Sequence, residues 1–267
     1  MKRIKLTVAY DGTNYHGWQI QPNAVTVEGE LNKAVSELTG EHIEVIGASR
    51  TDAGVHALGN VAVFDTESRI PGEKFSYALN QRLPEDIIIQ SSEEVALDFH
   101  PRYQECRKTY EYTILNRKFP LPEYRNTAHF DYGNLDVKAM QDACKAFIGE
   151  HDFAGFCSAG AQVKTTVRTI YSLEVECIEL GKAKHDGEDL YAGTDKQKEN
   201  DRLIRIRVNG NGFLYNMVRI IAGTLLEVGK ENIPSEKMGE IIASTDRAKA
   251  GPTAPARGLK LVEIRYV

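Results

Sequence analysis

The residues Gly47 to His56, GASRTDAGVH, place a cation and a carboxylate two positions apart, followed two positions later by a glycine. On an extended segment, residues two apart point the same way, so Arg50 and Asp52 can share one face. A nearby cation favours the ionised carboxylate, and partial desolvation sharpens its reactivity. Gly54 lets the backbone turn tightly beside it. From these residues alone, two interpretations are possible: a surface turn with a local ion pair, or a loop that carries a reactive carboxylate.

Two other groups of residues have types that can do chemistry, and each fits a structural role better. Asp52 and His56 stand four apart, but no third ligand follows at metal-binding spacing, so we expect no metal site. The turn Gly210-Asn211-Gly212 precedes an expected helix and resembles a phosphate-binding turn. Gly-x-Gly alone is a weak signal, so we interpret this turn as a strand-to-helix connection.

The composition is that of an ordinary globular chain of 267 residues, 42% apolar and 27% charged, which is long enough for two lobes. No apolar run reaches the length of a membrane span, and the N-terminus alternates apolar and polar residues instead of forming a signal-peptide core. We therefore expect no membrane association. The four cysteines are far apart and contain no CxxC pair, which favours a reducing cytoplasm.

The charge distribution bears on nucleic-acid binding. A formal net charge of −5 argues against indiscriminate attraction to phosphate. Three stretches nevertheless contain Lys or Arg but no Asp or Glu, namely residues 154–173, 202–226 and 247–262. If they fold onto one face, they form a basic groove on an acidic protein; chance clustering is the alternative.

Hydrophobic periodicity and turn residues predict the element order βαββαβ, twice. The first half is expected to contain strand 2–10, a helix from Val27 between Thr26 and Gly40, strands 43–47 and 58–65, a helix around 75–79 and strand 87–90. The second half is expected to contain strand 107–115, helix 137–148, strands 169–179 and 203–208, helix 213–228, a helix from Ser235 and strand 259–266.

This order predicts an α+β fold of two ferredoxin-like halves, residues 1–104 and 105–267, with mainly antiparallel sheets joined across a central cleft. The polar segment 181–202 is expected to be a long exposed hairpin insertion in the second half.

The sequence SRTDAGVHA closely resembles the signature of the tRNA pseudouridine synthase A family, in which the Asp of Arg-Thr-Asp-Ala-Gly-Val-His is catalytic. The similarity extends over nearly the whole chain, through YDGTNYHGWQIQPNAVTVEGEL, RKTYEYTILN, HDFAGFCSAG, GFLYNMVRIIAGTLLEVG and AGPTAPARGLKL. The resemblance implies the pseudouridine synthase fold. Ser49 stands where the family often has glycine, and the segment 181–202 is not explained; neither departure touches Asp52.

The resemblance implies that Asp52 is the nucleophile and that Arg50 helps to hold the extruded nucleotide. It further implies that Tyr110 lies against the target uracil, that Arg219 is the ionic partner of Asp52 and that Leu259 forms an apolar wall. From the residues alone, Tyr110 and Leu259 are interpreted as residues of the hydrophobic core. Arg219 belongs to a helix too apolar to leave it fully exposed, and a half-buried arginine requires a carboxylate.

The implied reaction converts uridine to pseudouridine at positions 38, 39 and 40 of the tRNA anticodon stem-loop. The bond between C1′ and N1 breaks, the uracil turns, and C5 bonds to C1′ with loss of only the C5 proton, so no cofactor or metal is needed. A base inside a stem must be flipped out to reach a carboxylate. Attack of Asp52 on C1′, its addition to C6 and removal of a sugar proton are all open. The resemblance also implies a homodimer in which tRNA spans both subunits.

Two competing functions belong to other classes. A non-enzymatic RNA-binding protein of this topology normally carries the aromatic signature K/R-G-F/Y-G/A-F-V-x-F/Y, which GNVAVFDT does not fit. A carboxylate-dependent glycoside hydrolase usually needs two facing carboxylates. Asp11, Asp65 and Asp98 are present, but nothing in the sequence aligns them with Asp52.

Overall fold

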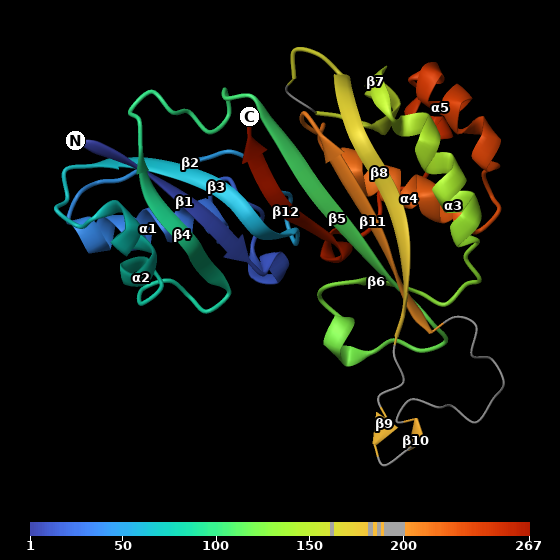
Figure 1. Ribbon diagram of the computed structural model, residues 1–267, viewed down its shortest axis with the longest axis horizontal. Helices are drawn as coiled ribbons and strands as arrows, with labels where there is room; N and C mark the ends of the chain where they lie inside the picture. Colours follow the sequence, from blue (N-terminus) through green and yellow to red (C-terminus); the bar gives the residue numbers. More distant parts are fainter. Residues whose placement is uncertain (161–162, 181–183, 186–187, 190–200) are drawn as a thin grey trace. The chain divides into compact units, whose positions relative to one another are not determined.

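The computed structural model describes residues 1–160, 163–180, 184–185, 188–189 and 201–267. Contacts divide the chain into two compact units (Figure 1), each discontinuous in sequence. The first unit comprises Met1–Tyr110, Asn209–Gly212 and Leu259–Val267; the second comprises Glu111–Val208 and Phe213–Gly258. The division into residues 1–104 and 105–267 stays a prediction, because these contacts do not show which segments fold independently.

The first unit has the predicted order βαββαβ. It contains β1 (Lys2–Tyr10), α1 (Val27–Thr39), β2 (Ile46–Gly47), β3 (His56–Thr66), α2 (Phe75–Leu79) and β4 (Ile87–Val95). β1 pairs antiparallel with both β3 and β4, and β2 pairs antiparallel with β3. The last strand of the chain, β12 (Leu259–Tyr266), adds to this sheet by pairing in parallel with β3.

The sequence pattern explains the first two elements of this unit. Burial alternates along β1, so that Ile4, Leu6 and Val8 face the core. Thr26 caps α1 by accepting a hydrogen bond from Gly29 N, and Gly40 ends the helix in the left-handed conformation. Both ends of α1 therefore lie where the sequence predicts them.

In the described residues of the second unit, a sheet is combined with the α-helices α3, α4 and α5. The unit contains β6 (His129–Asp131), α3 (Val137–Cys144), β7 (Gly149–Asp152), β8 (Val167–Glu179), α4 (Met217–Gly229) and α5 (Met238–Ser244), together with most of β5 (Cys106–Asn116) and β11 (Arg202–Gly210). The strand order is β5-β11-β8-β7, with β6 paired to β5. Figure 1 shows α3, α4 and α5 beside these strands. The α+β class with mainly antiparallel pairing is confirmed.

Several elements differ from the prediction. β2 is shorter, β4 extends to Val95 instead of 90, and α3 ends at Cys144 instead of 148. α4 begins at Met217 instead of 213, and β6 and β7 were not predicted. The late start of α4 has a backbone cause, since Asn216 has φ +60, which an α-helix does not accommodate. Of the predicted insertion 181–202, β9 (Lys184–His185) pairs antiparallel with β10 (Glu188–Asp189), and β11 begins at Arg202. The remainder, except residue 201, lies outside the described residues.

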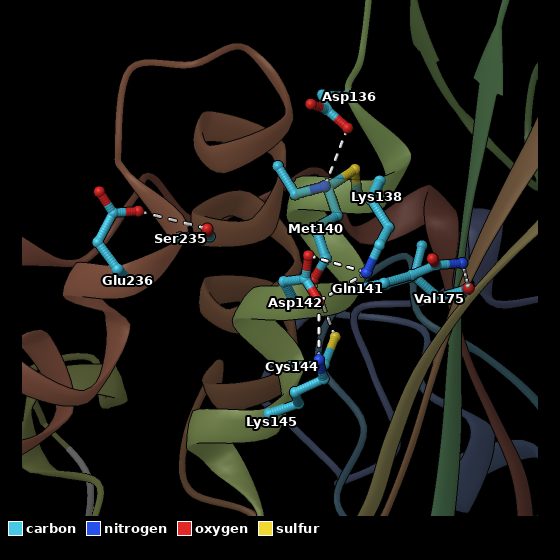
Figure 2. A network of polar contacts seen from close by, with 11 residues as sticks. Asp136, Lys138, Met140, Gln141, Asp142, Cys144, Lys145, Val175, Ser235 and Glu236 are labelled. Atoms are coloured by element: carbon cyan, nitrogen blue, oxygen red, sulfur yellow. Dashed lines mark hydrogen bonds and ion pairs between the residues drawn. The ribbon is translucent and has the colours of Figure 1, made fainter.

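The helices α3 and α4 show opposite characters. Every residue of α4 except Arg219 and Glu227 is buried. By contrast, Asp142 of α3 carries exposed ion pairs: Lys138 of α3 and Lys145, directly after α3, both donate to its carboxylate at 2.8 Å (Figure 2). These two hydrogen bonds lower the pKa of Asp142 to about 2. In the part of the chain that the structure describes, no helix has the length and apolar character needed to cross a membrane.

Candidate active site

The loop between β2 and β3, residues 48–55, carries the Arg-Thr-Asp sequence. Two backbone hydrogen bonds hold it against the turn that contains Gly17: Trp18 N donates to Thr51 O at 3.0 Å, and Gly54 N donates to Tyr15 O at 3.2 Å. Gly17 has φ +91, and a Cβ there would lie 2.6 Å from Thr51 O. Only glycine permits this approach, so the turn fixes the backbone immediately before Asp52.

Burial alternates from Ser49 to Asp52. Ser49 and Thr51 are both buried, whereas Arg50 is exposed and Asp52 is half-buried. Such alternation is typical of an extended segment with one side against the core. Arg50 and Asp52 therefore lie on the outward side of the loop.

The inward side of the loop ends in buried hydroxyl contacts. The hydroxyl of Thr51 lies 2.7 Å from that of Tyr10, and the hydroxyl of Ser49 lies 2.9 Å from that of Tyr110. Asn60 Nδ2 donates to the backbone carbonyl of Ser49 at 3.0 Å. Buried polar groups that bond one another in this way fix a unique arrangement. The sequence alone assigned no role to Ser49, Thr51 or Asn60. The signal that could have indicated that Ser49 and Thr51 face the core is the alternation of side-chain direction along the extended motif.

Two cations contact the start of the loop. Arg102 Nε donates to Gly47 O at 2.7 Å, and Lys108 Nζ donates to Ala48 O at 3.0 Å. Gly47 also has no room for a side chain, because a Cβ there would lie 2.2 Å from the indole nitrogen of Trp18. Sequence reasoning missed Arg102 and Lys108, since both contacts join residues more than fifty positions apart.

Tyr110 is a buried tyrosine whose hydroxyl faces this loop. Burial is the main cause that raises its pKa to about 12, and the negative charge of Asp52 raises the pKa further, while the hydrogen bond with Ser49 opposes them. With its pKa raised in this way, the Tyr110 phenol stays protonated at neutral pH.

His56 directly follows the loop, and its imidazole contacts the turn formed by Asp11 and Gly12. Its Nδ1 accepts from Gly12 N at 3.1 Å and lies 3.1 Å from a carboxylate oxygen of Asp11. The backbone contact requires an unprotonated Nδ1, and the contact with Asp11 requires a protonated one, so these are alternative states of His56. Among the described residues, no group of three or more His, Cys, Asp or Glu side chains is arranged to hold a metal ion.

Leu259 lies at the exit of the loop. It is the first residue of β12, and the parallel register pairs the next residue, Lys260, with His56. Leu259 therefore comes directly before the residue that pairs with the start of β3, where the loop ends. Leu259 is buried, as its core interpretation requires.

Arg219 lies in the second unit, on α4. Its Nε donates to Ala254 O at 2.7 Å, one of its terminal nitrogens donates to Asn216 Oδ1 at 2.8 Å, and its backbone carbonyl accepts from Ala254 N at 3.1 Å. These bonds fix the half-buried guanidinium against the segment after α4. Asp52 belongs to the first unit, so the ionic pairing of Arg219 with Asp52 stays a prediction.

Comparison with known proteins adds the family. A family model described as tRNA pseudouridine synthase matches residues 6–104 and 143–267. The chain belongs to this family. The matched residues include Arg50, Asp52, Arg219 and Leu259, whereas Tyr110 lies in the unmatched segment between the two ranges.

Curated relatives named tRNA pseudouridine synthase A match the full length of the chain. The protein of Ruminiclostridium cellulolyticum is 50% identical over 266 residues, and that of Acetivibrio thermocellus is 47% identical over 266 residues. The protein of Thermoanaerobacter sp. is 46% identical over 267 residues, and in all three pairs 100% of each chain is covered. The resemblance found in the sequence is thereby confirmed, and the tRNA pseudouridine synthases are isomerases.

Proposed function

We propose that the chain converts uridine to pseudouridine at positions 38, 39 and 40 of the tRNA anticodon stem-loop, with Asp52 as the nucleophile. Family membership supports the class of reaction. The observation that carries the choice of nucleophile is the alternation of the loop, in which Ser49 and Thr51 are held inward and Asp52 is left half-buried on the other side. A carboxylate in that position is partly shielded from water and still within reach of a substrate.

The reaction conserves atoms and electrons. The bond between C1′ and N1 breaks, a bond between C1′ and C5 forms, C5 loses a proton and N1 gains one. No oxidant or reductant is consumed. Asp52 acts by attack on C1′, by addition to C6 or by removal of a sugar proton, and each of these routes uses the ionised carboxylate.

The other site residues divide by exposure. Arg50 is exposed on the same side as Asp52 and is suited to hold the backbone of a flipped nucleotide. Tyr110 and Leu259 are buried next to the loop, and in this proposal they contact the uracil of the flipped nucleotide. Arg219 is the proposed partner of the Asp52 carboxylate, with its guanidinium already oriented by Ala254 and Asn216.

The proposed partner is tRNA, bound by a homodimer in the cytoplasm. In the second unit, Arg205 and Arg207 each lie 3.7 Å from the buried carboxylate of Glu111, and their side chains are 40% and 50% exposed. Guanidinium groups anchored on one side and open on the other are suited to phosphate contacts, which position an RNA without reading its sequence.

The experiment that tests the activity uses an anticodon-arm transcript labelled with tritium at C5 of its uracils. We expect release of tritium into water, because C5 loses its proton when it bonds to C1′. Retention of the label by a transcript that binds tightly would indicate a non-enzymatic RNA-binding protein. Release of free uracil would indicate a glycoside hydrolase.

A second set of transcripts tests the position. Each keeps a single uridine at position 38, 39 or 40 and carries cytidine at the other two. We expect release from all three transcripts. Equal release from a transcript with cytidine at all three positions would contradict the assignment to the anticodon stem-loop.

A further inference from the structure

Ser49 makes the side-chain contact that links the Arg-Thr-Asp loop to Tyr110. The two hydroxyl oxygens are 2.9 Å apart, and each residue is only 7% exposed. Ser49 lies three residues before Asp52, whereas Tyr110 lies on β5, 61 positions away. The contact therefore joins the loop of the proposed nucleophile to the tyrosine proposed to face the uracil.

We infer that Ser49 is a positioning residue, whose hydroxyl fixes the phenol of Tyr110 relative to the loop that carries Asp52. This inference rests on the proposed function, since Tyr110 acts on the uracil only if uridine is the substrate.

The backbone of Ser49 is fixed independently of its side chain. Asn60, a fully buried residue of β3, donates to the Ser49 carbonyl, and Ala48 N donates to Val61 O at 2.7 Å. The backbone of Ser49 is therefore already fixed, and only the rotation about its Cα–Cβ bond has to be restricted to place the hydroxyl oxygen. A short, anchored side chain of this kind sets a distance and a direction at low entropic cost.

Charge gives this contact a consequence for catalysis. Asp52 lies on the same loop as Ser49, and its negative charge adds to the raised pKa of the Tyr110 phenol. The phenol that Ser49 holds is thus the group whose position relative to the carboxylate matters. A shift of the tyrosine would change the placement of the uracil relative to Asp52, and small misplacements reduce rates strongly.

The experiment combines Ser49→Ala, Tyr110→Phe and the double variant in the tritium-release assay. We expect Ser49→Ala to lower kcat about tenfold while KM changes less than about twofold, because substrate binding is retained and alignment is lost. In the Tyr110→Phe background, the same change should alter kcat by less than about twofold, since the contact is already absent. Independent, multiplicative effects of the two substitutions would overturn the inference.

Ser92→Ala is the matched control. Ser92 is also 7% exposed and lies on β4 of the same unit, where its hydroxyl accepts from Ser76 N at 2.9 Å. We expect its kcat to stay within about twofold of the wild-type value, because it loses a buried hydroxyl that does not contact the loop. A loss equal to that of Ser49→Ala would mean general destabilisation and would overturn the positioning role.

A readout without turnover separates this inference from the proposed function. In protein labelled with 13C at the tyrosine rings, the Tyr110 signal is assigned by its loss in Tyr110→Phe. We expect Ser49→Ala to shift or broaden that signal and Ser92→Ala to leave it unchanged. An unmoved signal would overturn the inference even in an active enzyme. A wild-type protein that releases no tritium would instead overturn the proposed function, and with it the catalytic meaning of the contact.

Discussion

The loop 48–55 and the helix α4 are held by different forces. The loop has no regular structure, and its buried side ends in paired hydroxyls, as at Thr51 and Tyr10. α4 is held by apolar burial along nearly its whole length and by a backbone approach so close that a Cβ on Gly223 would lie 1.8 Å from Pro252 O. Hydrogen bonds give the loop direction, whereas packing gives the helix stability.

This difference separates the effects that we expect from substitutions in the two regions. A change on the outward side of the loop removes few apolar contacts, so it should alter turnover far more than unfolding free energy. A change inside α4 disturbs close packing and should lower stability first. The two classes of variant can therefore test whether placement and stability are divided between these regions.

Asp52→Asn is expected to have the largest effect. The amide keeps the size of the side chain but cannot act as an anionic nucleophile, so turnover should fall on the order of 10⁴-fold or more. The free energy of unfolding and tRNA binding should stay close to the wild-type values. Tritium release and urea unfolding measure the two quantities.

Asp98→Asn is the control for that substitution, because Asp98 is an exposed carboxylate of the same unit. Its turnover should match the wild type within about twofold. Substantial residual turnover in a clean Asp52→Asn preparation would remove Asp52 from the proposed role.

Gly223→Ala should have the largest effect on stability. The added Cβ would lie 1.8 Å from Pro252 O, a contact that requires a backbone shift of α4 or of the segment after it. We expect a loss of about 3 kcal/mol or more in unfolding free energy, measured by urea denaturation.

Gly239→Ala is the matched substitution for Gly223→Ala. Gly239 is a helical glycine of α5, and among the described residues no atom outside its own helical turn lies within 4 Å of the position that a Cβ would take. Alanine there should be neutral or should stabilise by up to about 1 kcal/mol. Equal changes in unfolding free energy for the two variants would show that helix propensity, and not the close approach to Pro252, determines the effect of alanine in α4.

The sequence predicts these two regions to different extents. The apolar run of α4 is a local pattern, so the helix is predicted, although Asn216 delays its start. The reactive loop is recognised through its motif. The hydrogen bonds that orient it are not predicted, because Tyr110 and Arg102 are distant in sequence and contact the loop only in the folded chain. Periodicity reports which side of a segment is buried and carries no information on such distant partners.

Alkaline pH should affect the loop more than α4, because the loop contacts buried tyrosines. The measured quantity is the free energy of unfolding. Burial, with the charge of Asp52, raises the pKa of Tyr110 from its ordinary value of 10 to about 12, so the folded state binds the phenolic proton more tightly than the unfolded state. This contribution is fully present below pH 10 and is lost as pH rises towards 12. Its loss should be on the order of 1 kcal/mol per pH unit within that window.

Tyr110→Phe removes the titrating group and should flatten this decline in urea unfolding measured between pH 9 and pH 11. Tyr77→Phe is the control, because the Tyr77 side chain is exposed. Identical pH profiles for the two variants would mean that Tyr110 ionises as readily in the folded protein as in the unfolded chain.

Thr51→Val should have a modest effect on both stability and turnover. Valine keeps the shape of threonine but loses the hydroxyl that contacts Tyr10 at 2.7 Å, which should cost about 1 kcal/mol of unfolding free energy. If hydrogen bonds give the loop its direction, turnover should also fall, by up to about tenfold. Thr66→Val is matched to it, since Thr66 of β3 is also buried and its hydroxyl donates to Glu41 at 2.8 Å. Thr66→Val should lose similar stability and keep its turnover, whereas equal losses of turnover in both variants would show that the hydroxyls inside the loop stabilise the unit without orienting Asp52.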